Sequence, residues 1–328
     1  MQPRNRPEHH VRQHHLRQSD LRQRPSRQSH EEFTALYRRL RQSAAGGARG
    51  ALDTITPDRV LAAAREVHLG RTVTMAAPVE TRATPDNPQP AGHTPTGPTE
   101  DEAHAPGLHF ATDRFSMNVH GDADSHLDAL CHVVYDGTLH GGVPATTLTS
   151  EGATALSVEL AGNGIVGRGV LLDIPRLRGV RWLEPGDHVT ADELLAAERS
   201  QHVHVGEGDL LFVRVGHRLR RIEAGPWDAA RTRAGLHPTA MEFLAERRVA
   251  ALGGDSNNDT APSVTDGVDF PVHVLGVHAL GLHLLDYLQF EDLVPLCEQE
   301  DRWSFLCVIA PLRLPHATGS PVNPIAVL

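Results

Sequence analysis

The sequence predicts an α/β protein, because short apolar segments alternate with segments of helical periodicity along its second half. Continuous apolar runs bounded by glycine, such as 169–174 and 209–215, are typical of strands that are buried on both faces. No internal repeat interrupts this alternation. The predicted strands are 169–174, 209–215, 249–252 and 305–310, and the predicted helices between them are 192–199 and 238–248.

The N-terminal part divides into two segments. Residues 1–28 consist largely of Arg, Gln, His and Pro, and we expect a disordered arm because they have too few apolar side chains to bury. Residues 29–77 are predicted to be helical. A capping box at Ser29 and Glu32 precedes apolar residues at helical spacing, and a second helix is expected from Thr56 to near Gly70.

Residues 78–106 contain seven prolines together with Thr, Gly and Asn, which predicts a long surface loop. Residues 107–328 are then expected to form the catalytic domain. A strand over 115–119 is predicted to lead into a histidine-rich motif.

Charge and composition exclude several classes of function. Residues 1–50 hold 11 Arg and 4 acidic residues, a net of +7, and the remainder holds 20 Arg and 37 acidic residues, a net of −17. An acidic body argues against a nucleic-acid platform. The absence of lysine excludes Schiff-base chemistry and a Walker-type phosphate loop. With three cysteines and no long apolar run, we expect a cytoplasmic protein without disulfides or a membrane span.

The motif at 125–132 reads S-H-L-D-A-L-C-H and places His126, Asp128 and His132 within seven residues. His120 and Asp122 lie just before it. Imidazole and carboxylate groups together suit a divalent ion such as Zn²⁺ or Mn²⁺, and a histidine beside the ion can move protons. The spacing alone is also compatible with a solvated polar loop in a chain with 22 histidines.

The residues 122–132 resemble the signature H-x-G-T-H-x-D-x-P-x-H of the metal-dependent cyclase family, which includes bacterial kynurenine formamidase and isatin hydrolase. The chain keeps the last His, the Asp and the second His of the signature, as His132, Asp128 and His126. Four others differ: Asp122 stands for the first His, Asp124 for Gly, Ser125 for Thr and Leu130 for Pro. Further segments resemble the family's longer members in the family's order, at 135–142, 167–173, 208–214, 271–286 and 310–324.

The resemblance implies a compact mixed β-sheet core flanked by helices, of the swivelling β/β/α type. It also implies a small-molecule substrate and a homodimer or higher homo-oligomer, with no nucleic-acid or membrane partner and no organic cofactor. The predicted cofactor is one divalent metal, Zn²⁺ or Mn²⁺.

The resemblance also implies roles for individual residues. His126 and Asp128 would bind the metal, and His132 would be the catalytic histidine. The third ligand is either Asp122, which replaces the family's first histidine, or His120, two residues earlier. His273 and Asp286 match the family's distal ligands. Each role has an alternative. His126 and Asp128 could form a hydrogen-bonded pair without a metal, His132 could be purely structural, and Asp286 could be a helix cap or a surface residue.

The function expected from these roles is metal-assisted hydrolysis of an amide, lactam or lactone carbonyl, with His132 moving the proton. A cyclase or dehydratase in natural-product biosynthesis would use the same Lewis acid and histidine to close a ring. A metal-free descendant that binds a small molecule is the third alternative, because Asp122 stands where the family has histidine.

Overall fold

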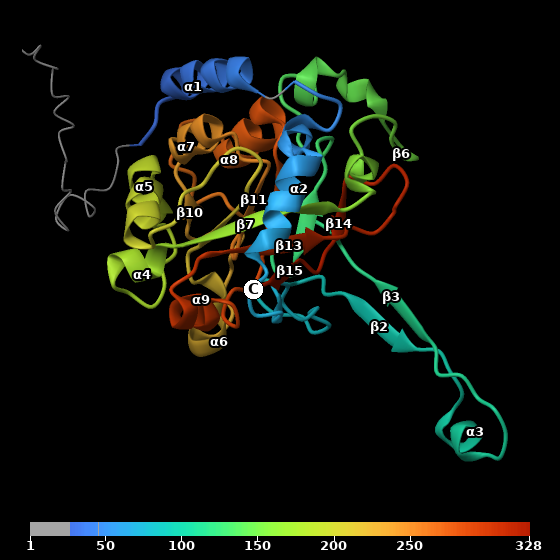
Figure 1. The fold of residues 1–328 in the computed structure, drawn as a ribbon. Coiled ribbons are helices and arrows are strands. Elements are labelled where there is room, and N and C mark those ends of the chain that lie inside the picture. Colours follow the sequence, from blue (N-terminus) through green and yellow to red (C-terminus); the bar gives the residue numbers. More distant parts are fainter. Residues whose placement is uncertain (1–26, 45) are drawn as a thin grey trace, which may run out of the picture.

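A nine-stranded mixed sheet forms the centre of the protein in the computed structural model, which describes residues 27–44 and 46–328 (Figure 1). Strands β7, β9, β11 and β12 are parallel, and the outer strands join them antiparallel. The α/β prediction with a mixed sheet is confirmed. In spatial order the strands are β1 (Thr72–Thr74), β15 (Ile325–Val327), β13 (Ser304–Ile309), β7 (Ile165–Asp173), β9 (Leu210–Arg214), β11 (Ala251–Gly254), β12 (His283–Asp286), β4 (His126–Asp128) and β14 (Gly319–Pro321).

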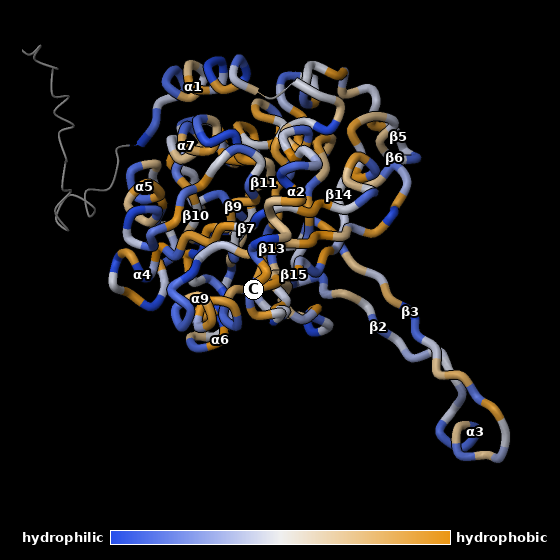
Figure 2. The backbone as a smooth tube through the Cα atoms, in the orientation of Figure 1, coloured by the Kyte–Doolittle hydropathy of each residue, from blue (hydrophilic) through white to orange (hydrophobic). Residues whose placement is uncertain are grey.

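The central strands are largely apolar because both of their faces are buried. Along β9, Leu211 and Val213 belong to one core, and Leu210 and Phe212 belong to the other. Figure 2 shows the resulting apolar interior along β7, β9 and β11. One core lies under helices α1, α5 and α7 and the π-helix η7, with bounds His30–Ser43, Ala191–Ser200, Ala240–Arg247 and Val274–Leu280. The other lies under η2 (Gly50–Thr54) and α9 (Val294–Glu300).

The N-terminal helices follow the sequence signals at their starts. The capping box of Ser29 and Glu32 forms, and α1 buries Phe33, Leu36 and Leu40. Helix α2 (Pro57–Ala63) begins after Thr56 but continues only as the short 3₁₀ helix η3 (Ala64–Glu66). The chain leaves the helix before Gly70 because the Leu69 N–H donates to the Leu328 carbonyl, which starts pairing with the C-terminal strand.

Residues 92–116, which lie in the sequence between the N-terminal helices and the histidine-rich motif, form an arm that projects from the body (Figure 1). It consists of β2 (Gly92–Pro95), helix α3 (Glu100–His104) and β3 (Asp113–Ser116), and the two strands pair antiparallel. The segment 78–106 therefore contains a strand and a helix in addition to loop. The strand predicted over 115–119 is wrong for most of its length, because only residues 115 and 116 lie in a strand, at the end of β3, and β3 does not join the central sheet.

Short elements complete the chain. Helices α4 (Ile174–Arg178) and α6 (His217–Ala224) follow β7 and β9, and α8 (Pro271–His273) runs directly into η7. No helix within 27–44 or 46–328 is long and apolar enough to cross a membrane. The remaining elements are the strand pairs β5 (Leu148–Thr149) with β6 (Gly152–Ala153) and β8 (His188–Val189) with β10 (Gly235–Leu236), and the 3₁₀ helices η4 (His140–Gly142), η5 (Ala145–Thr147) and η6 (Val158–Ala161).

The N-terminal segment 1–28, predicted to be disordered, lies almost wholly outside the described residues.

Candidate metal centre

Strand β4 places the first two candidate ligands on one face of the sheet. It lies between β12 and β14, with His126 opposite Asp286 and Asp128 opposite Gly319. Since alternate residues of a strand share a face, His126 and Asp128 point the same way. Both side chains are buried.

Asp128 lies at the centre of the site. Its Oδ1 atom accepts a hydrogen bond from His120 Nδ1 at 2.8 Å and lies 3.7 Å from His126 Nε2. Its Oδ2 atom lies 3.9 Å from His132 Nε2 and 3.4 Å from His273 Nε2. This buried oxygen accepts no hydrogen bond from any described residue. Burial raises the pKa of Asp128, but the surrounding imidazoles outweigh it and hold that pKa well below its usual value.

The carboxylate of Asp259 orients the ring of His273 towards Asp128. Asp259 accepts the backbone N–H groups of Val272 and His273 at the start of α8, and it lies 2.6 Å from His273 Nδ1. The Nε2 atom of His273 consequently faces Asp128 and lies 3.5 Å from Asp286 Oδ2. Burial lowers the pKa of His273, but the neighbouring carboxylates of Asp128, Asp259 and Asp286 outweigh burial and raise that pKa well above its ordinary value.

Asp286 is fixed by two amides that follow β11. Asn257 Nδ2 donates to its Oδ2 atom at 2.9 Å, and Asn258 Nδ2 donates to its Oδ1 atom at 2.6 Å. Sequence reasoning missed Asn257, Asn258 and Asp259. A signal existed, because these polar residues come soon after a buried parallel strand, where ligand-binding loops of α/β sheets gather.

The structure separates the two rivals for the third ligand position. His120 reaches Asp128, and its ring stacks on that of His132 with centroids 3.8 Å apart. Asp122 instead accepts a hydrogen bond from the hydroxyl of Tyr287 at 2.7 Å. In the part of the chain that the structure describes, Asp122 belongs to neither of the groups that could hold a metal.

His132 lies at the edge of the site, in a turn rather than on a helix, because its N–H donates to the Ala129 carbonyl. Its side chain is 28% exposed. Burial lowers the pKa of His132 to about 4, so the imidazole is neutral near pH 7. Two groups of ligand atoms share the Asp128 carboxylate and could hold a metal ion: His120, His126 and Asp128, and Asp128, His132 and His273.

A family model described as "Putative cyclase" matches residues 48–258. The chain belongs to the cyclase family. A crystal structure described as a novel cyclase is 31% identical to this cyclase-family chain, with a TM-score of 0.77 over 86% of this chain and 94% of that one.

Two structures described as isatin hydrolases share the fold of this cyclase-family chain at lower identity. Isatin hydrolase A from Ralstonia solanacearum is 22% identical, with a TM-score of 0.51 over 83% of this chain and 97% of that one. An isatin hydrolase bound to the product analogue thioisatinate is 18% identical, with a TM-score of 0.51 over 84% and 99% of the two chains. No curated protein matches the chain.

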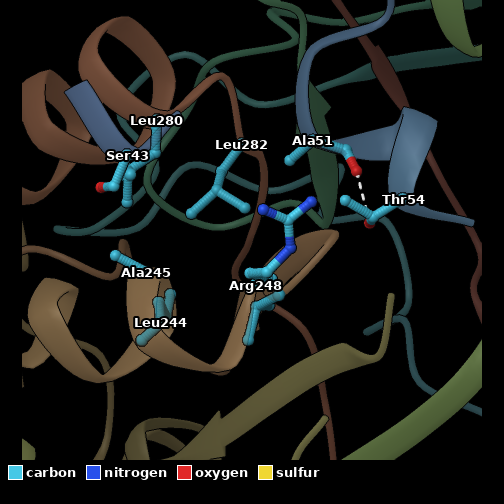
Figure 3. Close-up of a pocket in the computed structure, with 9 residues that line it drawn as sticks. Ser43, Ala51, Thr54, Leu244, Ala245, Arg248, Leu280 and Leu282 are labelled. Atoms are coloured by element: carbon cyan, nitrogen blue, oxygen red, sulfur yellow. Dashed lines mark hydrogen bonds between the residues drawn. The ribbon is translucent and has the colours of Figure 1, made fainter. Parts of the chain in front are cut away.

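A hollow elsewhere on this cyclase-family chain is not part of the metal centre. Figure 3 shows it between α7, η2 and the end of η7, where leucine and alanine side chains surround the guanidinium of Arg248. None of the histidines or carboxylates around Asp128 lines it. The hollow is therefore separate from the candidate metal centre.

Proposed function

We propose that the protein is a metal-dependent hydrolase that acts on an amide, lactam or lactone carbonyl of a small molecule. The observation that carries the proposal is the buried Asp128 Oδ2 atom, which has no hydrogen-bond donor among the described residues and is surrounded by imidazole nitrogens. A buried carboxylate oxygen without a partner is costly, and a bound cation would remove that cost.

The spacing of the donor atoms fits a metal ion. Two atoms that each lie about 2.0–2.2 Å from a tetrahedral ion are about 3.4 Å apart. His273 Nε2 lies 3.4 Å from Asp128 Oδ2 and 3.5 Å from Asp286 Oδ2, and His126 Nε2 lies 3.7 Å from Asp128 Oδ1. We assign these four residues and His120 as the ligand set. Asp122 is left out because its described contact is the hydrogen bond from Tyr287, whereas Asp286 lies beside His273, another donor of the set.

The ligand set, a mixture of imidazole and carboxylate groups, suits Zn²⁺ or Mn²⁺. Such an ion would supply a Lewis acid that polarises the substrate carbonyl and lowers the pKa of a coordinated water. The protein's own part is to fix the donors. Asp259 orients His273, and Asn257 and Asn258 hold Asp286, so little reorganisation is needed when the ion binds.

His132 is the proton carrier in this proposal. Its ring is neutral near pH 7 because burial lowers its pKa to about 4, and a neutral imidazole has one nitrogen free to accept a proton. The stacked ring of His120 limits its rotation. Its partial exposure leaves it open to a substrate that enters from solvent.

The test measures metal content and hydrolysis together. We expect stoichiometric Zn²⁺ or Mn²⁺ in the purified chain and hydrolysis of at least one of three probes: isatin, N-formylkynurenine or a simple lactone. The variant His132→Gln should keep the metal and lose about 10²- to 10⁴-fold in kcat.

The double variant His126→Ala/Asp128→Ala is the matched control and should lose both metal and activity. Full activity in His132→Gln would contradict the role of the proton carrier. A metal-loaded protein that turns over none of the probes would favour ring closure, and a chain that binds no metal would favour the metal-free small-molecule binder.

A further inference from the structure

A buried arginine, Arg233, contacts the loop that follows β11. Only 2% of its surface is exposed. Its Nη1 atom donates to the backbone carbonyls of Ala229 and Ala230 at 2.9 and 3.1 Å. The hydrogen bonds that its guanidinium makes to described residues all end on neutral oxygens and none on a carboxylate. Burying a cation away from a counter-ion is costly, so a specific role for Arg233 is expected among the groups that it contacts.

The other hydrogen bonds of Arg233 reach the two residues that hold the distal ligands. Its Nε atom donates to the backbone carbonyl of Asp259 at 3.0 Å, and its Nη2 atom donates to Asn257 Oδ1 at 2.9 Å. Asn257 in turn donates to the carboxylate of Asp286, and Asp259 lies beside the ring of His273. One planar fork of N–H groups therefore contacts the support of each distal ligand.

The amide of Asn257 lies between a group that can only donate and a group that can only accept. A guanidinium has no acceptor and an ionised carboxylate has no donor, so one orientation of the amide satisfies both. Its Oδ1 atom then faces Arg233 and its Nδ2 atom faces Asp286, as the structure shows. We infer that Arg233 is a positioning residue of the metal centre, which sets the Asn257 amide so that an N–H group faces Asp286.

The backbone fixes the place from which Arg233 acts. Arg233 and Ala261 exchange two backbone hydrogen bonds, of 3.0 and 3.1 Å. A Cβ atom at Gly235 would lie 2.4 Å from the carbonyl carbon of Asp259, so this glycine permits the close approach of the two segments. The ring of Phe270 packs against the guanidinium, with its centroid 5.4 Å from the guanidinium carbon. The distance from Arg233 to Asn257 is thus set by rigid neighbours.

The orientation of Asn257 is tested on the metal-free, full-length chain by ¹⁵N NMR. Its side-chain amide, assigned by its loss in Asn257→Ala, should exchange with solvent at least about tenfold more slowly in the wild type than in Arg233→Lys. Lysine keeps the charge but has a single ammonium group in place of the fork. The exposed Asn163 is the reference in the same spectrum.

Two results of this measurement would overturn the inference. One is equal exchange of the Asn257 amide in the wild type and in Arg233→Lys. The other is exchange of the wild-type Asn257 amide as fast as that of Asn163, and this result needs no variant to fold.

Titration with Zn²⁺ and Co²⁺ tests the consequence for metal binding, which rests on the function proposed above. Arg233→Lys should bind Zn²⁺ about 10- to 100-fold more weakly than the wild type. It should also alter the visible absorption of bound Co²⁺, because that absorption depends on the arrangement of the donors. Arg214→Lys is the matched control, since Arg214 is also buried but forms its ion pairs with Asp173 and Glu291. It should bind both ions like the wild type.

A double variant tests whether Arg233 acts through Asn257. Asn257→Ala alone should weaken Zn²⁺ binding, and Arg233→Lys added to it should change the affinity by less than about twofold. Losses that multiply in the double variant would show that Arg233 acts on its own and would overturn the inference. A chain that binds neither ion would reject the proposed function, and the exchange of the Asn257 amide would still decide the role of Arg233.

Discussion

Asp128 shows how one residue can organise a site. Two histidine rings lie beside each oxygen of its carboxylate. The Oδ2 atom nevertheless has no hydrogen-bond donor within the described residues. A charge buried in this way must be compensated. Protonated imidazoles partly neutralise the negative charge of Asp128. A bound divalent ion would neutralise this charge while the imidazoles stay unprotonated. Protons and metal would then compete for the same atoms, so metal affinity should fall as the pH falls.

His283 gives a prediction about stability and pH. This residue at the start of β12 is completely buried, and neither ring nitrogen has a hydrogen-bond partner in the described chain. Burial lowers the pKa of His283 to about 4, against an ordinary value of 6.5. As the pH falls from 6.5 towards 4, the unfolded chain takes up a proton and the folded chain does not, so the free energy of unfolding decreases. At pH 5 the loss from this residue is about 2 kcal/mol.

Urea denaturation at pH 7 and pH 5 measures this effect. The variant His283→Leu should lose about 2 kcal/mol less than the wild type between the two pH values. His68→Leu, at an exposed histidine, is the control and should behave like the wild type. The same pH dependence in His283→Leu and wild type would contradict the prediction.

At the scale of the element, the start of α8 gives a prediction about metal binding. Asp259 accepts two backbone N–H groups there and lies beside His273 Nδ1, so one carboxylate sets both the helix start and the ring orientation. Asp259→Asn keeps the shape and removes the charge. We expect metal affinity to fall about 10- to 100-fold with the fold intact.

Competitive titration with Zn²⁺ checks this expectation, and circular dichroism checks that α8 and its surroundings still fold. The exposed Asp269, just before α8, offers a matched loss of charge in Asp269→Asn. This control should bind Zn²⁺ like the wild type. Equal affinity in Asp259→Asn would show that Asp259 serves the helix start alone.

The strands could be predicted from the sequence where burial on both faces makes the chain nearly continuously apolar, as in β9 and the second half of β7. Strand β13 is also apolar in sequence, although its residues alternate between buried and half-buried. Strand β11 runs two residues beyond its predicted end because Gly253 belongs inside it. A Cβ atom at Gly253 would lie 2.7 Å from Phe212, so this glycine permits close packing and does not end the strand. The arm strands carry no comparable signal, since neither face of them is buried.

Some residues of the candidate site could also be predicted from the sequence, and others could not. His126, Asp128 and His132 are close in the sequence, so spacing alone could suggest them. His273 and Asp286 lie far along the chain, and only the family resemblance connected them with the motif. The second set of contacts, from Asn257, Asn258 and Asp259, depends on how the loop after β11 turns back. The position of these residues after a buried strand suggests a ligand-binding loop, but it does not specify which side chain each of them contacts.

At the scale of the whole molecule, the metal centre joins parts of the chain that are distant in sequence. Strand β4 lies between β12 and β14 near one edge of the sheet, and His273 of α8 reaches Asp128 from a distant part of the chain. An ion held between β4, β12 and α8 would therefore link three segments that separate on unfolding. Its binding should stabilise the whole fold and not only the site.

Thermal unfolding with and without metal tests this last expectation. A ligand that binds only the folded state at 100 times its Kd adds about 2.7 kcal/mol, which corresponds to a rise in Tm of about 4 °C for a chain of this size. We expect this rise when Zn²⁺ or Mn²⁺ replaces a chelator. Asp128→Asn should unfold at the same temperature in both conditions, because the shared carboxylate is gone. An equal rise in Asp128→Asn would place the stabilising ion elsewhere in the molecule.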